Sequence, residues 1–205
     1  MKNSFFAGLL SLTIMISCQP DKQLTNYVNP LLGTATLWET KDLGYERHLK
    51  TRTWGAEVFP GSSVPNAMVQ LSPVTQFRSG AGYQYEDTVI YGFSHTNKGH
   101  WNLLHLPVLP VTGNVSSGDY ASTYSHSNES ARPGYYQVFL ERYGVNAELT
   151  STLRCAYHKY TFRPDDDKKV LVDITRTNNG VRDWSIQKVD DYTFSVNQDA
   201  EGNIR

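Results

Sequence analysis

The chain has 205 residues, and its 19 lysines and arginines nearly balance its 20 aspartates and glutamates. This length suits one domain with a sizeable core, and the balanced charge without a basic stripe argues against nucleic acid as a partner. The sequence contains only two cysteines, Cys18 and Cys155, which do not make a disulfide framework. We expect Cys155, which has apolar neighbours, to be buried as a small hydrophobic residue.

An apolar run from Phe5 to Ile16 follows Lys2 at the start of the chain. The run is shorter than the ~20 residues that a membrane-spanning helix needs, and this combination is typical of a secretory signal peptide. It ends at Ser17-Cys18, a small residue before a cysteine, which resembles a bacterial lipobox. Lipidation at Cys18 is our hypothesis, and ordinary signal cleavage beside an incidental cysteine is the alternative.

These features divide the N-terminal part into a lipoprotein signal peptide over residues 1–17 and a tether over residues 18–26. A lipid on Cys18 would anchor a soluble domain to the membrane without making it a spanning protein. We therefore expect a protein of the bacterial cell envelope, located in the periplasm or at the cell surface.

Short runs rich in Val, Thr, Tyr and Phe, bounded by turn residues, recur along the chain and predict strands. In the clearest run Val145, Ala147 and Leu149 fall on one face and the residues between them on the other, as in a half-buried antiparallel strand. No stretch has sustained helical periodicity. The sequence therefore predicts an all-β fold, an antiparallel β-sandwich. The other strand-like runs are 136–140, 156–162, 169–174 and 192–196.

Several sequence blocks, in order along the chain, form a distinctive pattern. They are Y-V-N-P-L-L-G-T (27–34), F-P-G-S-S-V-P (59–65), M-V-Q-L-S-P (68–73), G-Y-Q-Y (82–85), I-Y-G-F-S-H-T (90–96) and H-K-Y-T-F (158–162). Together they resemble the N-terminal domain of glycoside hydrolase family 92, the calcium-dependent exo-acting α-mannosidases. The resemblance covers nearly all of residues 27–205.

The resemblance implies a β-sandwich that packs on a C-terminal (α/α)6 barrel, with the active site between the two domains. It also implies inverting hydrolysis, in which an acid and a base stand ~6.5–9.5 Å apart. In this family those carboxylates and most ligands of the Ca²⁺ cofactor come from the barrel. We therefore assign no catalytic and no metal-binding residue to this chain. Because the resemblance places these groups on the barrel, we expect the chain to be inactive alone. Gly202 and Asn203 look like a turn before a return strand, so we expect a domain incomplete at its C-terminal end.

The region between Trp54 and Gly113 is rich in aromatic residues, glycines and histidines and has few charges. Aromatic rings suit the C–H faces of sugars, neutral imidazole can bond to hydroxyls, and glycine permits close backbone approach. Each candidate has a structural alternative, such as a required turn, an exposed ion pair or a core histidine. We assign a substrate-binding role to Phe59, Gly61, Arg78, His95, His100 and Trp101.

Other residues of this region are given structural roles. Tyr83 and Tyr85 are expected to fill the core or to pack against the barrel, and His105, which alternates with leucines, is expected on a strand. The surface from Phe59 to Trp101 is expected to be exposed and apolar where its partner domain is absent.

The leading hypothesis is the substrate-shaping N-terminal domain of an inverting exo-α-mannosidase. Its partners would be a mannose-containing glycan and the C-terminal barrel. The alternatives are a stand-alone carbohydrate-binding surface lipoprotein and a truncated product without function. Residues 97–102 read N-K-G-H-W-N where the family often has H-L-S-G-x-G. Within this segment we expect residues 99–102 to set the protein's own substrate preference.

Overall fold

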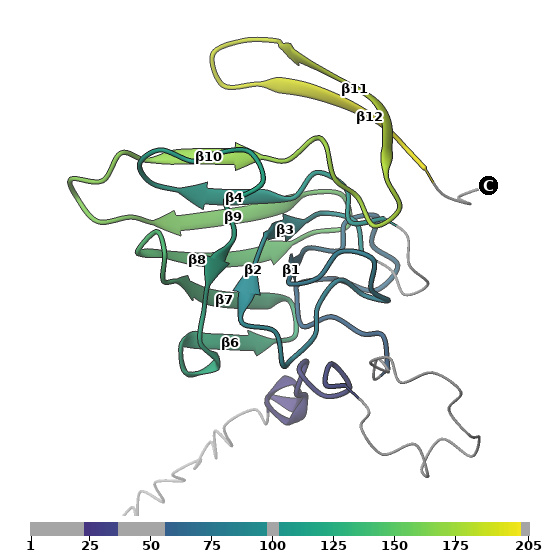
Figure 1. The fold of residues 1–205 in the computed structure, drawn as a ribbon. Helices are drawn as coiled ribbons and strands as arrows, with labels where there is room; N and C mark the ends of the chain where they lie inside the picture. The colour runs from purple at the N-terminus through teal and green to yellow at the C-terminus, as the bar shows by residue number, and fades with distance from the viewer. Residues whose placement is uncertain (1–22, 37–55, 98–102, 202–205) are drawn as a thin grey trace, which may run out of the picture.

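The computed structural model describes residues 23–36, 56–97 and 103–201. Within these ranges the chain is almost wholly β, with short 3-10 turns at η1 (Leu24–Tyr27) and η3 (His126–Asn128) (Figure 1). No helix of the described part is long and apolar enough to cross a membrane.

Two four-stranded antiparallel sheets form the body of the domain. The first sheet has the order β1 (Ser72–Val74), β3 (Gly92–Ser94), β4 (Val108–Val111) and β10 (Lys169–Val172). The second has the order β6 (Glu129–Arg132), β7 (Tyr135–Leu140), β8 (Val145–Ser151) and β9 (Ala156–Thr161). The predicted all-β antiparallel sandwich is confirmed.

The second sheet is a meander that the local sequence explains. Burial alternates along β7 and β8, so that each strand turns one face to the core and the other outward. Val138 lies opposite Ala147 in the register, which places apolar side chains of both strands on the same face. Gly144 closes the turn between them with a φ of +65°. The period-two pattern of residues 145–151 is thus confirmed as a half-buried strand.

The first sheet is built from distant segments. β10 pairs with β4, and Leu171 lies opposite Leu109 although about sixty residues separate the two strands. β3 joins β4 through the pair Phe93 and Val108. A smaller two-stranded sheet, β2 (Val89–Ile90) with β5 (Ser122–Thr123), lies beside it.

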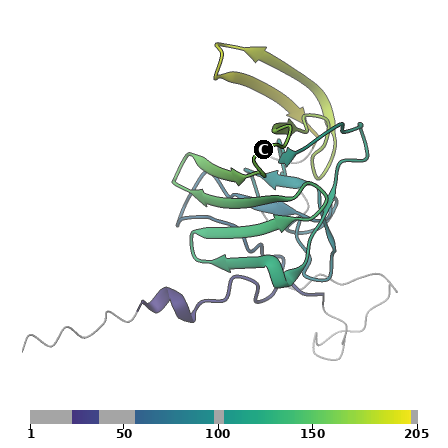
Figure 2. The ribbon, with the colours of Figure 1, turned by 90° about the vertical axis from the view of Figure 1, so that its left-hand side faces the viewer.

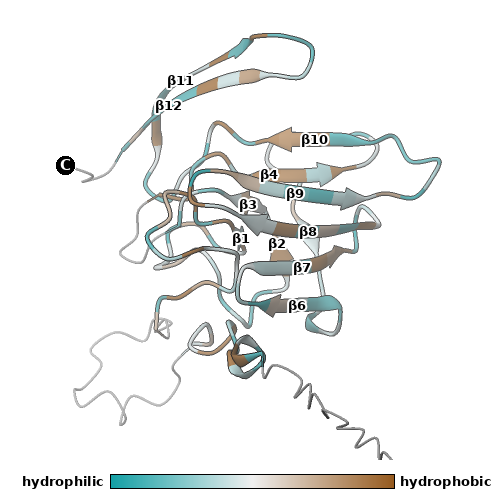
Figure 3. Ribbon diagram, turned by 180° about the vertical axis from the view of Figure 1, so that it is seen from behind, coloured by the Kyte–Doolittle hydropathy of each residue, from teal (hydrophilic) through white to brown (hydrophobic). Residues whose placement is uncertain are grey.

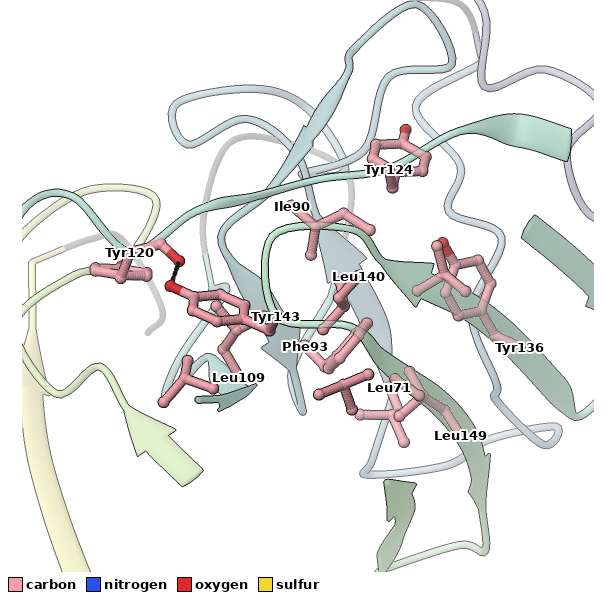
Figure 4. Close-up of a cluster of buried hydrophobic side chains, with 14 residues drawn as sticks. Leu71, Ile90, Phe93, Leu109, Tyr120, Tyr124, Tyr136, Leu140, Tyr143 and Leu149 are labelled. Atoms are coloured by element: carbon pink, nitrogen blue, oxygen red, sulfur yellow. Dashed lines mark hydrogen bonds between the residues drawn. The ribbon is translucent and has the colours of Figure 1, made fainter. Parts of the chain in front are cut away.

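The core lies between the sheets and draws its side chains from both (Figure 4). Aromatic residues supply much of it, and the hydroxyl of Tyr143 donates a hydrogen bond of 2.7 Å to the carbonyl of Tyr120. A buried tyrosine is stable there because its hydroxyl has a partner. The buried members are Leu71, Ile90, Phe93, Leu109, Val111, Tyr120, Tyr124, Tyr136, Val138, Leu140, Tyr143, Val145, Ala147 and Leu149.

The last two strands, β11 (Val181–Lys188) and β12 (Phe194–Ala200), form a hairpin that reaches away from the sandwich (Figures 1 and 2). Ile186 lies opposite Val196, so these two share a face with Trp184 and Phe194. Apolar residues occur on both strands (Figure 3), and Trp184, Ile186 and Phe194 are exposed. The hairpin therefore has one uncovered apolar face.

The structure corrects three expectations drawn from the local sequence. The last strand-like run, predicted over 192–196, is instead the strand β12 from Phe194 to Ala200, and its partner β11 was not predicted. His105 precedes β4 and is not on a strand, because Leu104 and Leu106 on either side of it have left-handed backbone angles that interrupt the extended pattern.

Cys155 is exposed, so the expectation that it would be buried is wrong. It lies in the turn between β8 and β9, where its N–H donates to Oγ1 of Thr152 at 3.1 Å and its carbonyl accepts from the N–H of Thr152 at 2.8 Å. A tight turn at the sheet edge points its side chains toward solvent, whatever the polarity of the neighbouring residues.

Candidate functional site

Asn178 connects three segments that are far apart in the sequence. Its Oδ1 accepts hydrogen bonds from the N–H groups of Arg78 (2.5 Å) and Ser79 (3.3 Å), and its Nδ2 donates to the carbonyl of Ser79 (2.7 Å). Its own N–H donates to the carbonyl of Leu103 at 3.0 Å. We call Arg78, Ser79, Leu103 and Asn178 the Asn178 junction.

Our reasoning from the sequence did not single out Asn178. The run T-N-N-G at 177–180 is a turn signal, and Thr177 Oγ1 both accepts from the N–H of Gly180 (2.9 Å) and donates to its carbonyl (2.8 Å). The turn could be foreseen. Its contact with Arg78 could not be predicted, because a local sequence pattern carries no information about a partner one hundred residues away.

The loop that carries Arg78 is closed on itself. The N–H groups of Thr75 and Gln76 both donate to the carbonyl of Gly82, at 2.8 and 3.1 Å. Ser79 Oγ donates to the carbonyl of Gln76 (2.8 Å) and accepts from the N–H of Gly82 (3.0 Å). These bonds hold Arg78 at the tip of a compact loop with its side chain exposed.

Left-handed backbone angles gather at the junction. Among the described residues, six that are not glycine have positive φ, and Arg78 (+58°), Leu103 (+71°), Leu104 (+59°) and Leu106 (+49°) belong to the two segments that meet there. A left-handed residue with a side chain costs roughly 1–2 kcal/mol. Such strain collects at functional sites, where the surrounding contacts hold it in place. This clustering marks the junction as the candidate site.

The junction includes Leu103, which directly follows in sequence the segment that departs from the family pattern. The N–H of Leu104 donates to the carbonyl of Thr96 at 3.0 Å, so the described residues on either side of 98–102 lie close together. His100 and Trp101, both assigned to the substrate site, fall within 98–102 and lie outside the described residues. Cys18 lies outside them as well.

Asn97, directly before that segment, is fully buried. Neither Oδ1 nor Nδ2 of its amide has a hydrogen-bond partner in the described part of the structure. A buried polar group without a partner costs about 1–3 kcal/mol, and native proteins keep few of them. The site therefore contains hydrogen-bonding capacity that the described chain does not use.

His95 takes part in a hydrogen-bonded chain of side chains at the end of β3. Its Nε2 lies 2.9 Å from Nε2 of His158 on β9, and Nδ1 of His158 lies 2.7 Å from the hydroxyl of Tyr160. Burial lowers the pKa of His95, and burial together with the nearby His95 lowers the pKa of His158 to about 3. Both rings are therefore neutral at pH 7 and bind each other as donor and acceptor.

Two further residues, Phe59 and Gly61, were assigned to the substrate site from the sequence. Phe59 is half-buried, and Gly61 packs so closely on the next segment that an added Cβ would stand 1.9 Å from the carbonyl oxygen of Leu71. Gly61 thus has a structural role in this chain. Through Asn178 the structure joins Arg78 to Leu103, and its contacts pair His95 with His158.

The expectation of an exposed apolar surface from Phe59 to Trp101 is confirmed only in part. Met68 is 72% exposed and Tyr85 is 38% exposed, but Tyr83 and Phe93 are buried in the interior. The ring of Tyr85 stacks on His126 with centroids 4.0 Å apart. Polar loop contacts cover more of this region than its composition indicates.

The described residues contain no group of three or more His, Cys, Asp or Glu side chains that could hold a metal ion. Ca²⁺ prefers six to eight oxygen ligands. Because the described residues contain no such group of acidic side chains, we assign no step of the chemistry to a metal bound there.

The sequence matches the model of the glycosyl hydrolase family 92 N-terminal domain over residues 27–204. The chain belongs to family 92. The matched range contains the whole sandwich, the hairpin and every residue of the Asn178 junction. The family predicted from the sequence blocks is thereby confirmed.

Solved structures of family 92 enzymes resemble this domain. A family 92 α-mannosidase from Bacteroides thetaiotaomicron, in complex with mannoimidazole, is 30% identical and has a TM-score of 0.70 over 83% of this chain and 22% of that chain. An inverting mannosidase of the same family and organism is 25% identical, with a TM-score of 0.57 over 73% of this chain and 19% of that chain. No curated protein sequence matches the chain.

The family 92 domain described here therefore spans about a fifth of the length of the enzymes it resembles. It corresponds to their N-terminal domain, within a larger architecture of more than one domain. It thus has the fold of the N-terminal domain of a glycoside hydrolase family.

Proposed function

We propose that this domain shapes the substrate site of an inverting exo-α-mannosidase that removes terminal α-mannosides from glycans. The catalytic carboxylates and the Ca²⁺ site would lie on a C-terminal (α/α)6 barrel that packs against this domain. The domain alone would then bind part of the substrate without cleaving it. The leader sequence extends the proposal to a lipid anchor on Cys18 in the bacterial cell envelope.

One observation carries the proposal: the domain resembles, over most of its length, an α-mannosidase whose structure contains mannoimidazole. The strained backbone of the Asn178 junction and the unpartnered amide of Asn97 support it, because such features mark a site without supplying catalytic groups. An acid and a base on opposite sides of a glycosidic bond are needed for inversion, and the junction itself contains no carboxylate.

The test compares this chain with the complete product of its gene. We expect the complete product to release mannose from α-linked mannobiose, with the β-anomer appearing first in proton NMR spectra, and to lose activity in a calcium chelator. The 205-residue chain should release no mannose under the same conditions. Release of the α-anomer first, or hydrolysis by the chain alone, would contradict the proposal.

Calorimetry with methyl α-mannoside separates the enzyme from a stand-alone binding module. Heat of binding to this chain, with no hydrolysis by the complete product, would favour the carbohydrate-binding lipoprotein. Signal-peptide processing is followed separately, by mass spectrometry of the mature N-terminus. Expression of a Cys18→Ser variant provides the control, and an unlipidated wild-type N-terminus would refute the anchor alone.

A further inference from the structure

A cavity of about 310 Å³ opens beside the Asn178 junction, between the loop that carries Arg78 and the connection from β10 to β11. Two arginines line it, together with an aromatic ring and small polar residues. The lining residues are Phe77, Arg78, Thr175, Arg176, Thr177, Asn179 and Gly180. No carboxylate belongs to this lining, so the side-chain charges facing the cavity are positive.

The guanidinium of Arg78 has no partner within the described chain, although its backbone is held in place. Its backbone is fixed by Asn178 Oδ1 at 2.5 Å, and its φ of +58° is a costly conformation for an arginine. Among the residues that the structure describes, none forms an ion pair or a hydrogen bond with its guanidinium. The expected alternative, an exposed ion pair, is therefore not formed within the described chain.

The side chain of Arg176 is held by an ion pair and by two aromatic rings. Its Nε lies 3.6 Å from Oδ2 of Asp173, a carboxylate that also accepts hydrogen bonds from the hydroxyl of Tyr120 and from Thr175. Its guanidinium carbon lies 5.3 Å from the ring centre of Tyr120 and 5.9 Å from that of Phe77. Because the ion pair uses Nε, the terminal nitrogens of the guanidinium remain for a ligand.

This arrangement indicates the chemistry of the ligand. Guanidinium groups bind phosphate and carboxylate oxygens in a bidentate manner, and arginines fixed on aromatic rings lose little entropy when they do so. Phe77 adds an apolar wall that suits the face of a sugar ring. We propose that the cavity binds the anionic group of an acidic sugar, either a phosphate or a carboxylate, carried by the glycan substrate. The sugar's identity as part of a mannose-containing glycan rests on the proposed function, whereas binding of the anion does not.

One carboxylate stands at the edge of the cavity. An added Cβ on Gly180 would lie 2.9 Å from Oε2 of Glu201, so this acid is close to the lining and opposes an anionic ligand. The proposal therefore predicts opposite effects for two charge-neutralising changes. Arg78→Gln should weaken binding, and Glu201→Gln should strengthen it.

The experiment is calorimetric titration of the purified chain with mannose 6-phosphate, glucuronate, inorganic phosphate and unmodified mannose. We expect one of the acidic sugars to bind about tenfold or more tightly than mannose, since charge-assisted bonds to two arginines favour it. Preference for mannose 6-phosphate assigns the cavity to phosphate, and preference for glucuronate assigns it to carboxylate. Tighter binding of inorganic phosphate than of mannose also supports the anion site.

Arg78→Gln should abolish the preference for the acidic sugar, and Arg176→Lys, which keeps the charge without the fork, should reduce it less. Gln has the same backbone strain as Arg at position 78, and circular dichroism verifies the fold of each variant. Arg154→Gln is the matched control, because this exposed arginine lies in the turn between β8 and β9. Equal binding of mannose and both acidic sugars to the folded chain, or an unchanged preference in Arg78→Gln, would overturn the proposal.

The two proposals fail independently. If the complete gene product hydrolyses α-mannobiose but the chain has no preference for anions, only the cavity assignment is wrong. If the chain binds an acidic sugar through Arg78 while the complete product cleaves no mannoside, the anion site stands and the proposed function is wrong.

Discussion

The carboxylate of Glu129 accepts a hydrogen bond of 2.6 Å from the hydroxyl of Tyr136 in the interior of the sandwich. The hydroxyl of Tyr83 donates to the same carboxylate at 2.9 Å, and Nδ1 of His126 lies 2.6 Å from its Oε2. The side chain of Glu129 is fully buried. Burying a carboxylate is costly unless its oxygens are hydrogen-bonded, so this acid connects β6, β7 and the loop of Tyr83 as one unit.

Glu129→Ala should destabilise the domain by about 3 kcal/mol, because it leaves buried hydroxyls without an acceptor. Urea denaturation followed by tryptophan fluorescence measures the change in the free energy of unfolding. Glu141→Ala, at an exposed carboxylate in the turn after β7, is the control and should change stability by less than about 0.5 kcal/mol. Equal effects of the two substitutions would show that the network does not stabilise the fold.

Gly61→Ala should be more harmful than Gly134→Ala. The added Cβ at position 61 would meet the backbone of Leu71 and Ser72, which cannot move aside as a side-chain end can. At Gly134 the space is open and only the φ of +75° opposes alanine. We expect a loss of about 3 kcal/mol or more at position 61 and about 1 kcal/mol at position 134. Thermal unfolding of both variants provides the comparison, and the reverse order would contradict it.

Stability should fall in acid partly through His158. Its pKa is lowered to about 3 in the folded domain and is about 6.5 in the unfolded chain, so the unfolded state binds the proton first as the pH drops. The contribution of neutral His158 to the free energy of unfolding is fully present above about pH 6.5. It is lost as the pH falls from about 6.5 to about 3. At pH 5 the loss from this group is about 2 kcal/mol.

A His158→Gln variant tests this assignment. Its free energy of unfolding should change less between pH 7.5 and pH 5 than that of the wild type, whatever its stability at pH 7.5. The measurement is urea denaturation at several pH values. A variant whose pH dependence has the same slope as the wild type would show that His158 does not carry the proton linkage.

The exposed face of the β11–β12 hairpin should bind hydrophobic dyes. Trp184, Ile186 and Phe194 are 46%, 51% and 58% exposed on a two-stranded unit that has no third strand in the described structure. Uncovered apolar patches of this kind mark contact surfaces, and isolated hairpins are only marginally stable. The double variant Trp184→Ser/Phe194→Ser should lower the fluorescence of bound 8-anilinonaphthalene-1-sulfonate several-fold. Val170→Ser, on β10, is the control, and an equal decrease in both proteins would contradict the assignment.

Local patterns predicted the part of the fold that consecutive segments build. β7, β8 and β9 follow one another through short turns, so alternation along each strand was enough to identify them. The first sheet could not be found in this way, because β1 and β3 are very short and β10 returns to β4 from a distant part of the chain. Period-two patterns need several residues to be visible.

The same limit applies to the candidate site. Arg78 and His95 were chosen for the chemistry of their side chains and their loop-like setting. Asn178 and His158 were missed because each acts through a partner that is more than sixty positions away. The sequence also contained no indication of the left-handed backbone angles at Leu103 and Leu104, since leucine rarely adopts that conformation.

The hydrogen bonds of Asn178 set a condition for exchanging loops between related enzymes. Consider a chimaera that receives a foreign segment in place of residues 76–82 but keeps its own turn at 177–180. The side-chain amide of Asn178 would then lose the backbone groups that it binds at positions 78 and 79. The acceptor and the donor of that amide would then be buried without matching groups. An exchange of loops in this domain should therefore transfer both segments together, although they lie at distant points of the gene.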